Sequence, residues 1–296
     1  METVPAKHLL HRNRSTEWFG TDHTMNLYRG CCHGCLYCDS RSGCYRIEGF
    51  DTVRVKADAL RIFRDDLARK ARPAFISMGS MSDPYNPFER KLELTRHALE
   101  LMDAYSCGAA IATKSPLITR DMDILASIQA HSPVICKLTV TTADDGLAAR
   151  LEPNAPPPSR RLAALGELSG AGLFAGLLLM PVLPFLEDSE EGVLAVVEGA
   201  ARAGARFVYP AFGVTMRQGQ REYFLDGLER AFPGQGLRER YLRRFGDRYW
   251  CASPKAGKLW QAFTAACQTS GILYDMKSII RAASLGYGDR QLTFFD

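Results

Sequence analysis

The stretch Asn26–Asp39 reads NLYRGCCHGCLYCD and holds four of the nine cysteines of this 296-residue chain. Three of them, Cys31, Cys35 and Cys38, are spaced C-x3-C-x2-C. Three thiolates on one tight loop can bind three irons of a [4Fe–4S] cluster, whereas an electron-transfer ferredoxin normally supplies a fourth cysteine. The fourth iron is then open to another ligand. The loop therefore predicts a reaction centre rather than a site that only carries electrons.

Zinc is the main alternative for this loop. Structural zinc sites usually have four nitrogen or sulfur ligands. His33 or Cys44 could complete a tetrahedron, while Cys32 adjoins Cys31 and would strain to share its metal. A zinc site without catalysis would make the chain a binding module that recruits a partner. A disulfide scaffold fits poorly, because the chain is long, has an odd number of cysteines and begins without an apolar leader.

Composition limits the function only broadly. Hydrophobic residues make up 46% of the chain, enough for a large core, and the net charge of +4 permits a nucleic-acid partner without requiring one. No run approaches the ~18 apolar residues of a transmembrane helix. Residues 1–18 contain no apolar core of signal-peptide length, so we expect a cytoplasmic protein without a membrane anchor.

Short apolar runs alternate with longer amphipathic ones between residues 24 and 212. The expected strands are 24–28, 74–78, 109–113, 134–141, 173–179 and 206–209, and the expected helices between them are 57–70, 88–104, 120–129, 159–169 and 189–203. Repeated strand–helix units imply right-handed crossovers and a parallel sheet. Six units predict an α/β fold with a partial (β/α)6 TIM-like barrel. Function is then expected at the C-terminal strand ends, where the cysteine loop follows the first strand.

We expect three parts along the chain. An N-terminal segment (1–23) precedes the barrel (24–212), and an α-helical C-terminal extension (213–296) follows it. Helices are expected at 220–231, 237–245 and 255–269, without clear strands. We interpret this extension as a cap over the open side of the barrel.

Polar side chains follow or end several of the expected strands. Ser80 and Ser82 follow the second strand, and Lys114 ends the third as a compact point charge. Thr139 and Thr141 share one face of the fourth strand. Each has an ordinary explanation as well, because serine caps helices, lysine is usually solvated, and threonine is common in strands.

Together these segments resemble the radical S-adenosylmethionine (SAM) superfamily, and within it the spore photoproduct lyase-like group. The resemblance spans about residues 25–210. It rests on the cysteine loop from Arg29 to Cys38 and on the segments SDPY (82–85), TR (95–96), TKSP (113–116), TT (141–142), LEP (151–153) and PVLP (181–184).

The resemblance implies an enzyme. A [4Fe–4S] cluster on Cys31, Cys35 and Cys38 would bind SAM at its open iron. One electron from an external reductant would cleave SAM to a 5'-deoxyadenosyl radical, which abstracts hydrogen from the substrate. The implied SAM contacts are Tyr37, Ser80 or Ser82, Lys114, and Thr139 or Thr141. The implied substrate is nucleic acid, and a small molecule or peptide is the alternative.

The chain departs from spore photoproduct lyase at two places. That enzyme uses a cysteine in the loop after the second strand as hydrogen donor, and a tyrosine follows its last cluster cysteine. Here the loop Gly79–Ser82 has no cysteine, and Asp39 follows Cys38. We therefore do not expect thymine-dimer repair by that mechanism.

The chain ends in QLTFFD. The segment Gln291–Phe295 resembles the short peptide by which bacterial DNA-processing proteins dock on the replication sliding clamp. Such peptides bind as extended segments through a few apolar anchors. Clamp docking would indicate a DNA-associated substrate. Alternatively, Leu292, Phe294 and Phe295 pin the tail to the domain.

Overall fold

A seven-stranded sheet forms the centre of the computed structural model, which describes residues 2–287. The strand order is β10-β9-β8-β7-β6-β3-β2. Six of these strands run parallel: β3 (His23–Met25), β6 (Phe75–Met78), β7 (Gly108–Thr113), β8 (Val134–Thr139), β9 (Ala175–Leu179) and β10 (Phe207–Pro210). At one edge, β2 (Leu10–Arg12) runs antiparallel to β3. This arrangement confirms the predicted α/β fold with a partial (β/α)6 TIM-like barrel.

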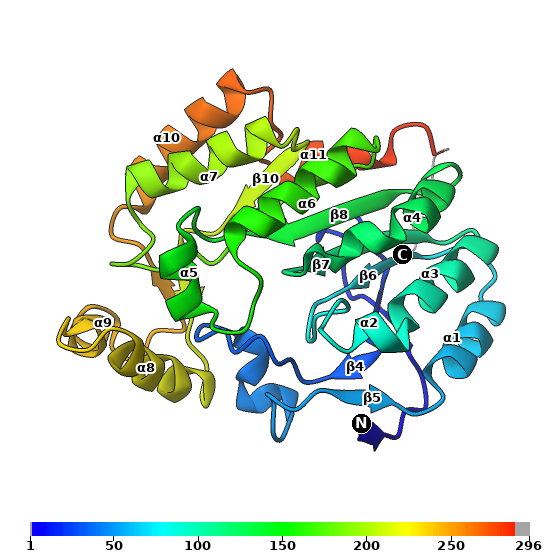
Figure 1. The fold of residues 1–296 in the computed structure, drawn as a ribbon, viewed down its shortest axis with the longest axis horizontal. Helices are drawn as coiled ribbons and strands as arrows, with labels where there is room; N and C mark the ends of the chain where they lie inside the picture. Colours follow the sequence, from blue (N-terminus) through cyan, green and yellow to red (C-terminus); the bar gives the residue numbers. More distant parts are fainter. Residues whose placement is uncertain (1, 288–296) are drawn as a thin grey trace.

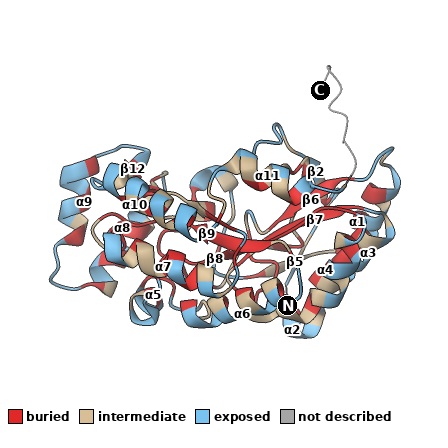
Figure 2. Ribbon diagram, turned by 90° about the horizontal axis from the view of Figure 1, so that it is seen from above, coloured by how far each residue is buried: buried red, intermediate tan, exposed pale blue. Residues whose placement is uncertain are grey.

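Helices follow the strands and cover one side of the sheet (Figure 1). They are α1 (Ala59–Ala68), α2 (Glu89–Leu92), α3 (Leu94–Ala104), α4 (Met122–Gln129), α5 (Asp145–Leu151), α6 (Pro158–Gly170) and α7 (Glu190–Arg202). Val193, Val196, Val197 and Ala200 of α7 are all buried, at the helical spacing expected of a stripe that packs on a sheet. Figure 2 shows buried strands under helices whose outer sides are exposed.

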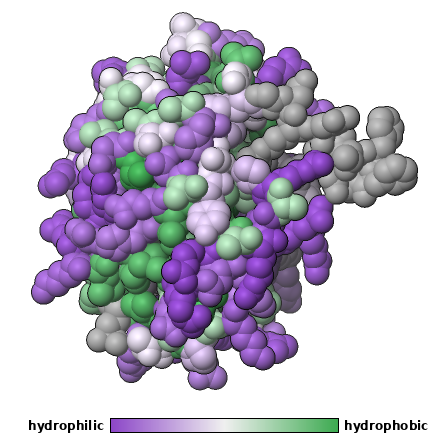
Figure 3. All heavy atoms as spheres, turned by 90° about the vertical axis from the view of Figure 1, so that its right-hand side faces the viewer, coloured by the Kyte–Doolittle hydropathy of each residue, from purple (hydrophilic) through white to green (hydrophobic). Residues whose placement is uncertain are grey.

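The outer faces of these helices are polar. Figure 3 looks at the right-hand side of Figure 1, where α1 and α3 lie, and most of this face is hydrophilic with scattered apolar groups. Within residues 2–287, no helix combines the length and hydropathy needed to cross a membrane.

The barrel interior has its own apolar cluster, which residues from both ends of the chain complete. Alternate residues of a strand point to opposite sides of the sheet. On β8, Cys136 and Leu138 therefore pack under the helices and Ile135 packs inside. The interior cluster comprises Phe19, Phe75, Ala110, Ile135, Leu178, Phe207, Ile279 and Ala283. Phe19 lies between β2 and β3, while Ile279 and Ala283 belong to α11 (Met276–Ser284).

The C-terminal extension contains the three predicted helices and more. These helices are α8 (Gln220–Ala231), α9 (Leu237–Phe245) and α10 (Ala256–Thr269), and α11 follows them. The expectation of no strands was wrong, because β11 (Gly213–Thr215) and β12 (Trp250–Ala252) form an antiparallel pair. Strands of three residues are too short to show alternation in the sequence. The extension packs on the barrel in part through α10, which contacts α7.

The first predicted strand was also too long. β3 ends at Met25, and the chain then turns into β4 (Tyr28–Arg29), which joins a separate sheet with β5 (Arg54–Lys56) and β1 (Thr3–Val4). The cysteine loop therefore follows β4 and not the central strand itself. The two boundaries proposed between the three parts of the chain remain predictions.

The loop after β6 depends on Gly79. Its φ is +91°, and a Cβ atom there would lie 2.0 Å from the carbonyl oxygen of Ala112 on β7. We expect Gly79→Ala to lower the free energy of unfolding by about 1–3 kcal/mol, through backbone strain and displacement of β7. Urea unfolding would measure this.

A matched control is Gly166→Ala. Gly166 lies inside α6, and a Cβ atom there would meet nothing within 4 Å. This change should raise stability by roughly 0.5–1 kcal/mol, because alanine loses less conformational entropy in a helix. Equal effects of the two substitutions would contradict the close approach of β6 and β7.

Candidate functional site

The cysteine loop is fixed to the segment that follows α5. The backbone N–H of Leu36 donates to the carbonyl of Leu151 at 2.9 Å. The side chain of Asn154 donates to the carbonyl of Cys32 at 3.1 Å, and its backbone N–H donates to the carbonyl of His33 at 3.1 Å. The loop is thus positioned by hydrogen bonds to a distant part of the chain.

The three predicted cluster cysteines lie close enough to act on one another electrostatically. Burial, together with nearby Asp83 and Cys38, raises the pKa of Cys31 to about 12. Burial also raises the pKa of Cys35 well above its ordinary value; Lys114 opposes this, while Glu152, Cys38 and Cys31 add to it. Metal binding would supply the positive charge that removes the thiol protons.

The donor set is chemically suited to a [4Fe–4S] cluster, in which each thiolate binds a different iron. All three cysteines are free thiols. In the described range 2–287, no three His, Cys, Asp or Glu side chains are grouped tightly enough to hold one metal ion. A structural zinc ion needs four such ligands.

A buried charge network adjoins the cysteines. Glu152, which is 1% exposed, accepts hydrogen bonds from the hydroxyl of Tyr37 and the guanidinium of Arg161. The ammonium of Lys114 lies 3.9 Å from Glu152 and 5.5 Å from the centre of the Tyr37 ring. The network brings together Tyr37 and Lys114, two residues predicted from separate segments of the sequence.

Electrostatics keep Lys114 charged. Burial acts to lower the pKa of Lys114, but Cys35 and Glu152 outweigh it, so that pKa lies above its ordinary value. Its side chain is 16% exposed. The structure therefore places a partly accessible positive charge beside the cysteine loop.

Asp83 orients the backbone that carries Lys114. Its carboxylate accepts hydrogen bonds from the Thr113 hydroxyl at 2.6 Å, and from the backbone N–H groups of Lys114 and Tyr85, both at 2.8 Å. His33 Nδ1 lies 3.5 Å from the same carboxylate. His33, considered above as a zinc ligand, thus faces Asp83.

The predicted hydroxyl contacts divide into two kinds. Ser82 is buried, and its hydroxyl donates a hydrogen bond to the backbone carbonyl of Tyr28 at 3.1 Å. Ser80 is exposed, and its hydroxyl lies 3.5 Å from the hydroxyl of Thr24. Thr139 and Thr141 are both buried. Their roles as SAM contacts remain predictions.

Sequence analysis did not identify Glu187, which follows the apolar turn after β9. Burial raises the pKa of Glu187 to about 8, although hydrogen bonds from Thr141 and from the Leu183 N–H lower it. The Leu183 bond is 3.0 Å long. The available signal in the sequence was an acidic pair, Glu187-Asp188, directly after the apolar stretch 173–186 that contains β9.

Glu187 predicts a pH dependence of stability. Its pKa is raised by folding, so its contribution is fully present below the ordinary glutamate range and is lost as pH rises towards 8. Between pH 5 and pH 8, we expect the free energy of unfolding of the wild type to fall by on the order of 2 kcal/mol because of Glu187. The Glu187→Gln variant should lack this part of the pH dependence. Urea unfolding at both pH values would measure it. Parallel pH profiles of the two proteins would contradict the raised pKa.

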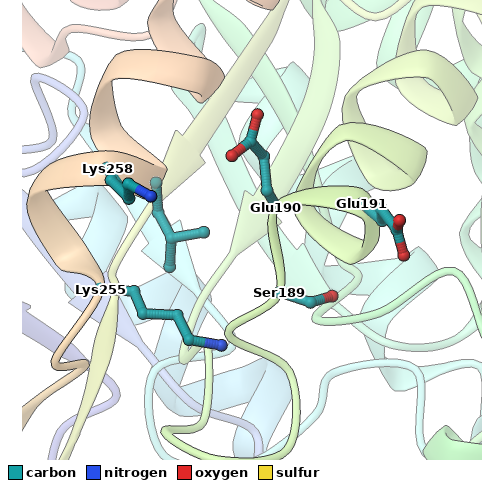
Figure 4. Close-up of a pocket in the computed structure, with 6 residues that line it drawn as sticks. Ser189, Glu190, Glu191, Lys255 and Lys258 are labelled. Carbon is teal, nitrogen blue, oxygen red and sulfur yellow. The ribbon is translucent and has the colours of Figure 1, made fainter.

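A surface pocket of about 270 Å³ lies elsewhere, between the start of α7 and α10 (Figure 4). Its lining is Ser189, Glu190, Glu191, Lys255, Lys258 and Leu259, with none of the cysteine-loop residues. Ser189 already caps α7, because its hydroxyl accepts the Gly192 N–H at 3.0 Å. The pocket is a charged gap between packed helices.

The fold and the cysteine loop define the class of protein, an α/β enzyme with a partial TIM-like barrel and three free cysteines in one loop. The model of the radical SAM superfamily matches residues 25–197 of the chain. The chain belongs to this superfamily, whose members use a [4Fe–4S] cluster and SAM.

The relatives found by sequence have no assigned function. The uncharacterized protein Rv2578c of Mycobacterium tuberculosis (strain ATCC 25618 / H37Rv) is 32% identical over 231 residues, which cover 76% of this chain and 68% of the relative. The uncharacterized protein MJ0683 of Methanocaldococcus jannaschii is 31% identical over 173 residues, covering 58% and 64%.

Solved structures show the same fold. Spore photoproduct lyase complexed with dinucleoside spore photoproduct matches with a TM-score of 0.65 and 16% identity, covering 91% of this chain and 80% of that one. The radical SAM methyltransferase TsrM of Kitasatospora setae, with tryptophan substrate and a SAM analogue bound, matches with a TM-score of 0.57 and 10% identity, covering 95% and 64%.

Proposed function

We propose that this enzyme holds a [4Fe–4S] cluster on Cys31, Cys35 and Cys38, binds SAM beside it, and abstracts hydrogen from a nucleic-acid substrate. The observation that carries the proposal is the grouping of these three free thiols next to the charged Lys114. When bound and reduced, the cluster and SAM would supply the radical that removes the hydrogen atom.

The side chains around the cysteines would orient SAM. The Lys114 ammonium is available for the SAM carboxylate, since it is partly exposed and Glu152 holds it at 3.9 Å. Tyr37 donates its hydroxyl to Glu152, which fixes the ring for packing against adenine. Ser80 or Ser82, and Thr139 or Thr141, remain our proposed hydroxyl contacts. An external reductant is required.

A nucleic-acid substrate is supported by the surface next to the cysteine loop. Arg217 lies 5.6 Å from the Tyr45 ring and 5.3 Å from the Tyr249 ring, and its guanidinium pairs with Asp39 at 3.2 Å. Tyr249 and Trp250 are 52% and 43% exposed. Aromatic faces beside arginine suit stacked bases and phosphates. Spore photoproduct lyase, which shares the fold, has been solved with a dinucleoside lesion.

The proposed sliding-clamp peptide, Gln291–Phe295, lies outside the described residues. Docking there would bring the enzyme to DNA and would agree with a nucleic-acid substrate. It stays a proposal that rests on the terminal sequence.

The test is anaerobic reconstitution with iron and sulfide, followed by dithionite and SAM, with 5'-deoxyadenosine measured by chromatography. Parallel reactions would contain a DNA oligonucleotide, a peptide mixture or no addition. We expect 5'-deoxyadenosine above the Cys35→Ala control, and more of it with DNA. A complete cluster that yields none under any condition would contradict the proposal.

Modification of a small molecule or peptide is the second candidate. The structure of TsrM with tryptophan bound shows that this fold also accepts an amino acid. Stimulation by the peptide mixture and not by DNA would favour it. Zinc in place of iron and sulfide would instead favour a non-catalytic binding module, which superfamily membership argues against.

A further inference from the structure

Lys137 lies inside the barrel. It occupies the middle of β8, where Cys136 and Leu138 face the helices, so alternation turns Lys137 inward with Ile135. Its ammonium is 4.5 Å from the centre of the Phe19 ring, which belongs to the interior cluster. The side chain is therefore surrounded by the barrel and not by solvent.

Among the residues that the structure describes, none supplies a counter-charge to Lys137. It is 1% exposed, and within residues 2–287 no hydrogen bond or ion pair reaches its ammonium. Burial lowers the pKa of Lys137 to about 7, and Cys136, the neighbour that opposes this, is a thiol rather than a carboxylate. Lys114, in contrast, has Glu152 at 3.9 Å.

Packing alone does not account for such a residue. Lysine is almost never fully buried unless it is paired. Burying an ammonium group without a hydrogen-bond acceptor costs more free energy than one cation–π contact supplies. Phenylalanine is also a weaker partner for a cation than tryptophan. A buried polar group without a partner calls for a functional explanation, such as an ion that binds there.

The position of Lys137 suits a ligand that enters from the mouth. Thr139 lies two residues nearer the C-terminal end of β8 on the same face, and the residue beside Lys137 on β7 is the small Ala112. Phe19, fully buried, packs against the ammonium. Lys137 is therefore the next inward-facing residue of β8 below Thr139, at the strand end where SAM is proposed to bind.

We propose that Lys137 is a substrate-binding residue whose ammonium takes an oxyanion, a carboxylate or a phosphate, when the substrate enters the barrel. That the anion belongs to the substrate rests on the proposed radical SAM function. Anion binding itself does not, so the two can fail separately.

The experiment uses the full chain with its reconstituted cluster and no SAM. Its melting temperature is followed against sodium phosphate and against sodium acetate, each compared with sodium chloride at equal ionic strength. The variants are Lys137→Met, which keeps the apolar stem, and Lys91→Met, which removes an exposed lysine as control. Iron and sulfide content confirms that each variant is folded.

We expect phosphate or acetate to stabilise the wild type and Lys91→Met beyond chloride, and to bind Lys137→Met at least about tenfold more weakly, as for loss of a charge-assisted hydrogen bond. A phosphate response would indicate a nucleotide or nucleic-acid substrate, and an acetate response a carboxylic acid. No anion-specific gain in the wild type, or an equal gain in Lys137→Met, would overturn the proposal.

Two additions keep the test decisive. If Lys137→Met does not fold, Lys137→Gln, which keeps a polar end without the charge, takes its place. The titration is then repeated with saturating SAM. A stabilisation by the anion that persists supports a substrate site, whereas competition with SAM would assign the anion to the SAM carboxylate and overturn the substrate assignment.

Discussion

Replacing Cys35 with alanine is expected to abolish the cluster and, with it, all SAM cleavage. Cys35 is the most deeply buried of the three predicted ligands, at 7% exposed, and the other two thiols act on it directly. Loss of one of three thiolates leaves two irons without protein ligands. Iron and sulfide analysis, the visible absorbance of the cluster and 5'-deoxyadenosine production would all fall to the level of protein that has not been reconstituted.

The matched control is Cys32→Ala. Cys32 adjoins Cys31 in the same loop, and its carbonyl rather than its thiol is held, by Asn154 at 3.1 Å. This variant should keep its cluster, because the backbone contact survives the substitution. Loss of the cluster in Cys32→Ala but not in Cys31→Ala would show that the ligand assignment is wrong.

Replacing Glu152 with glutamine should cause the largest loss of stability. The change keeps the shape of the side chain but leaves Arg161, 1% exposed, without its counter-charge. Removing one partner of a buried pair costs about 3–5 kcal/mol, because the other charge stays buried. Asp123→Asn is the control, since Asp123 is 66% exposed in its pair with Arg96. Exposed pairs contribute at most ~1 kcal/mol.

Urea unfolding at several pH values would check this. Burial acts to raise the pKa of Glu152, but Lys114 and Arg161 outweigh it, so folding lowers that pKa. The contribution of Glu152 is therefore present at neutral pH and is lost as pH falls below the ordinary glutamate range. The free energies of unfolding of the wild type and of Glu152→Gln should therefore approach each other as the pH is lowered. Equal stability at pH 7 would mean that the network is not formed.

The sequence predicted those features whose signals are local. The spacing of Cys31, Cys35 and Cys38 lies within eight residues, and the barrel strands from β6 to β10 lie in mainly apolar runs between turn residues. The strands β11 and β12 were missed because three residues cannot show a period. The hydrogen bond from the Ser82 hydroxyl to the carbonyl of Tyr28 could not be predicted either, because no sequence pattern indicates it.

Contacts between residues far apart in the sequence could not be predicted from local sequence patterns. Tyr37 and Glu152 meet across 115 positions of the chain, and neither residue indicates the other. Lys137 did carry a signal, because a lysine inside the apolar run VICKLTV must point either into the barrel or under the helices. The choice between the two depends on the register of β8, which only the structure supplies.

The closing of the barrel interior by α11 has a consequence for synthesis of the protein. Phe19 and Met276 meet across 257 positions, with the backbone N–H of Phe19 3.3 Å from the Met276 sulfur. Contacts this distant in sequence slow folding, because a long loop must close before they form. The cysteine loop leaves the ribosome well before α11, which seals the interior. The cysteines therefore leave the ribosome while the barrel interior is still open.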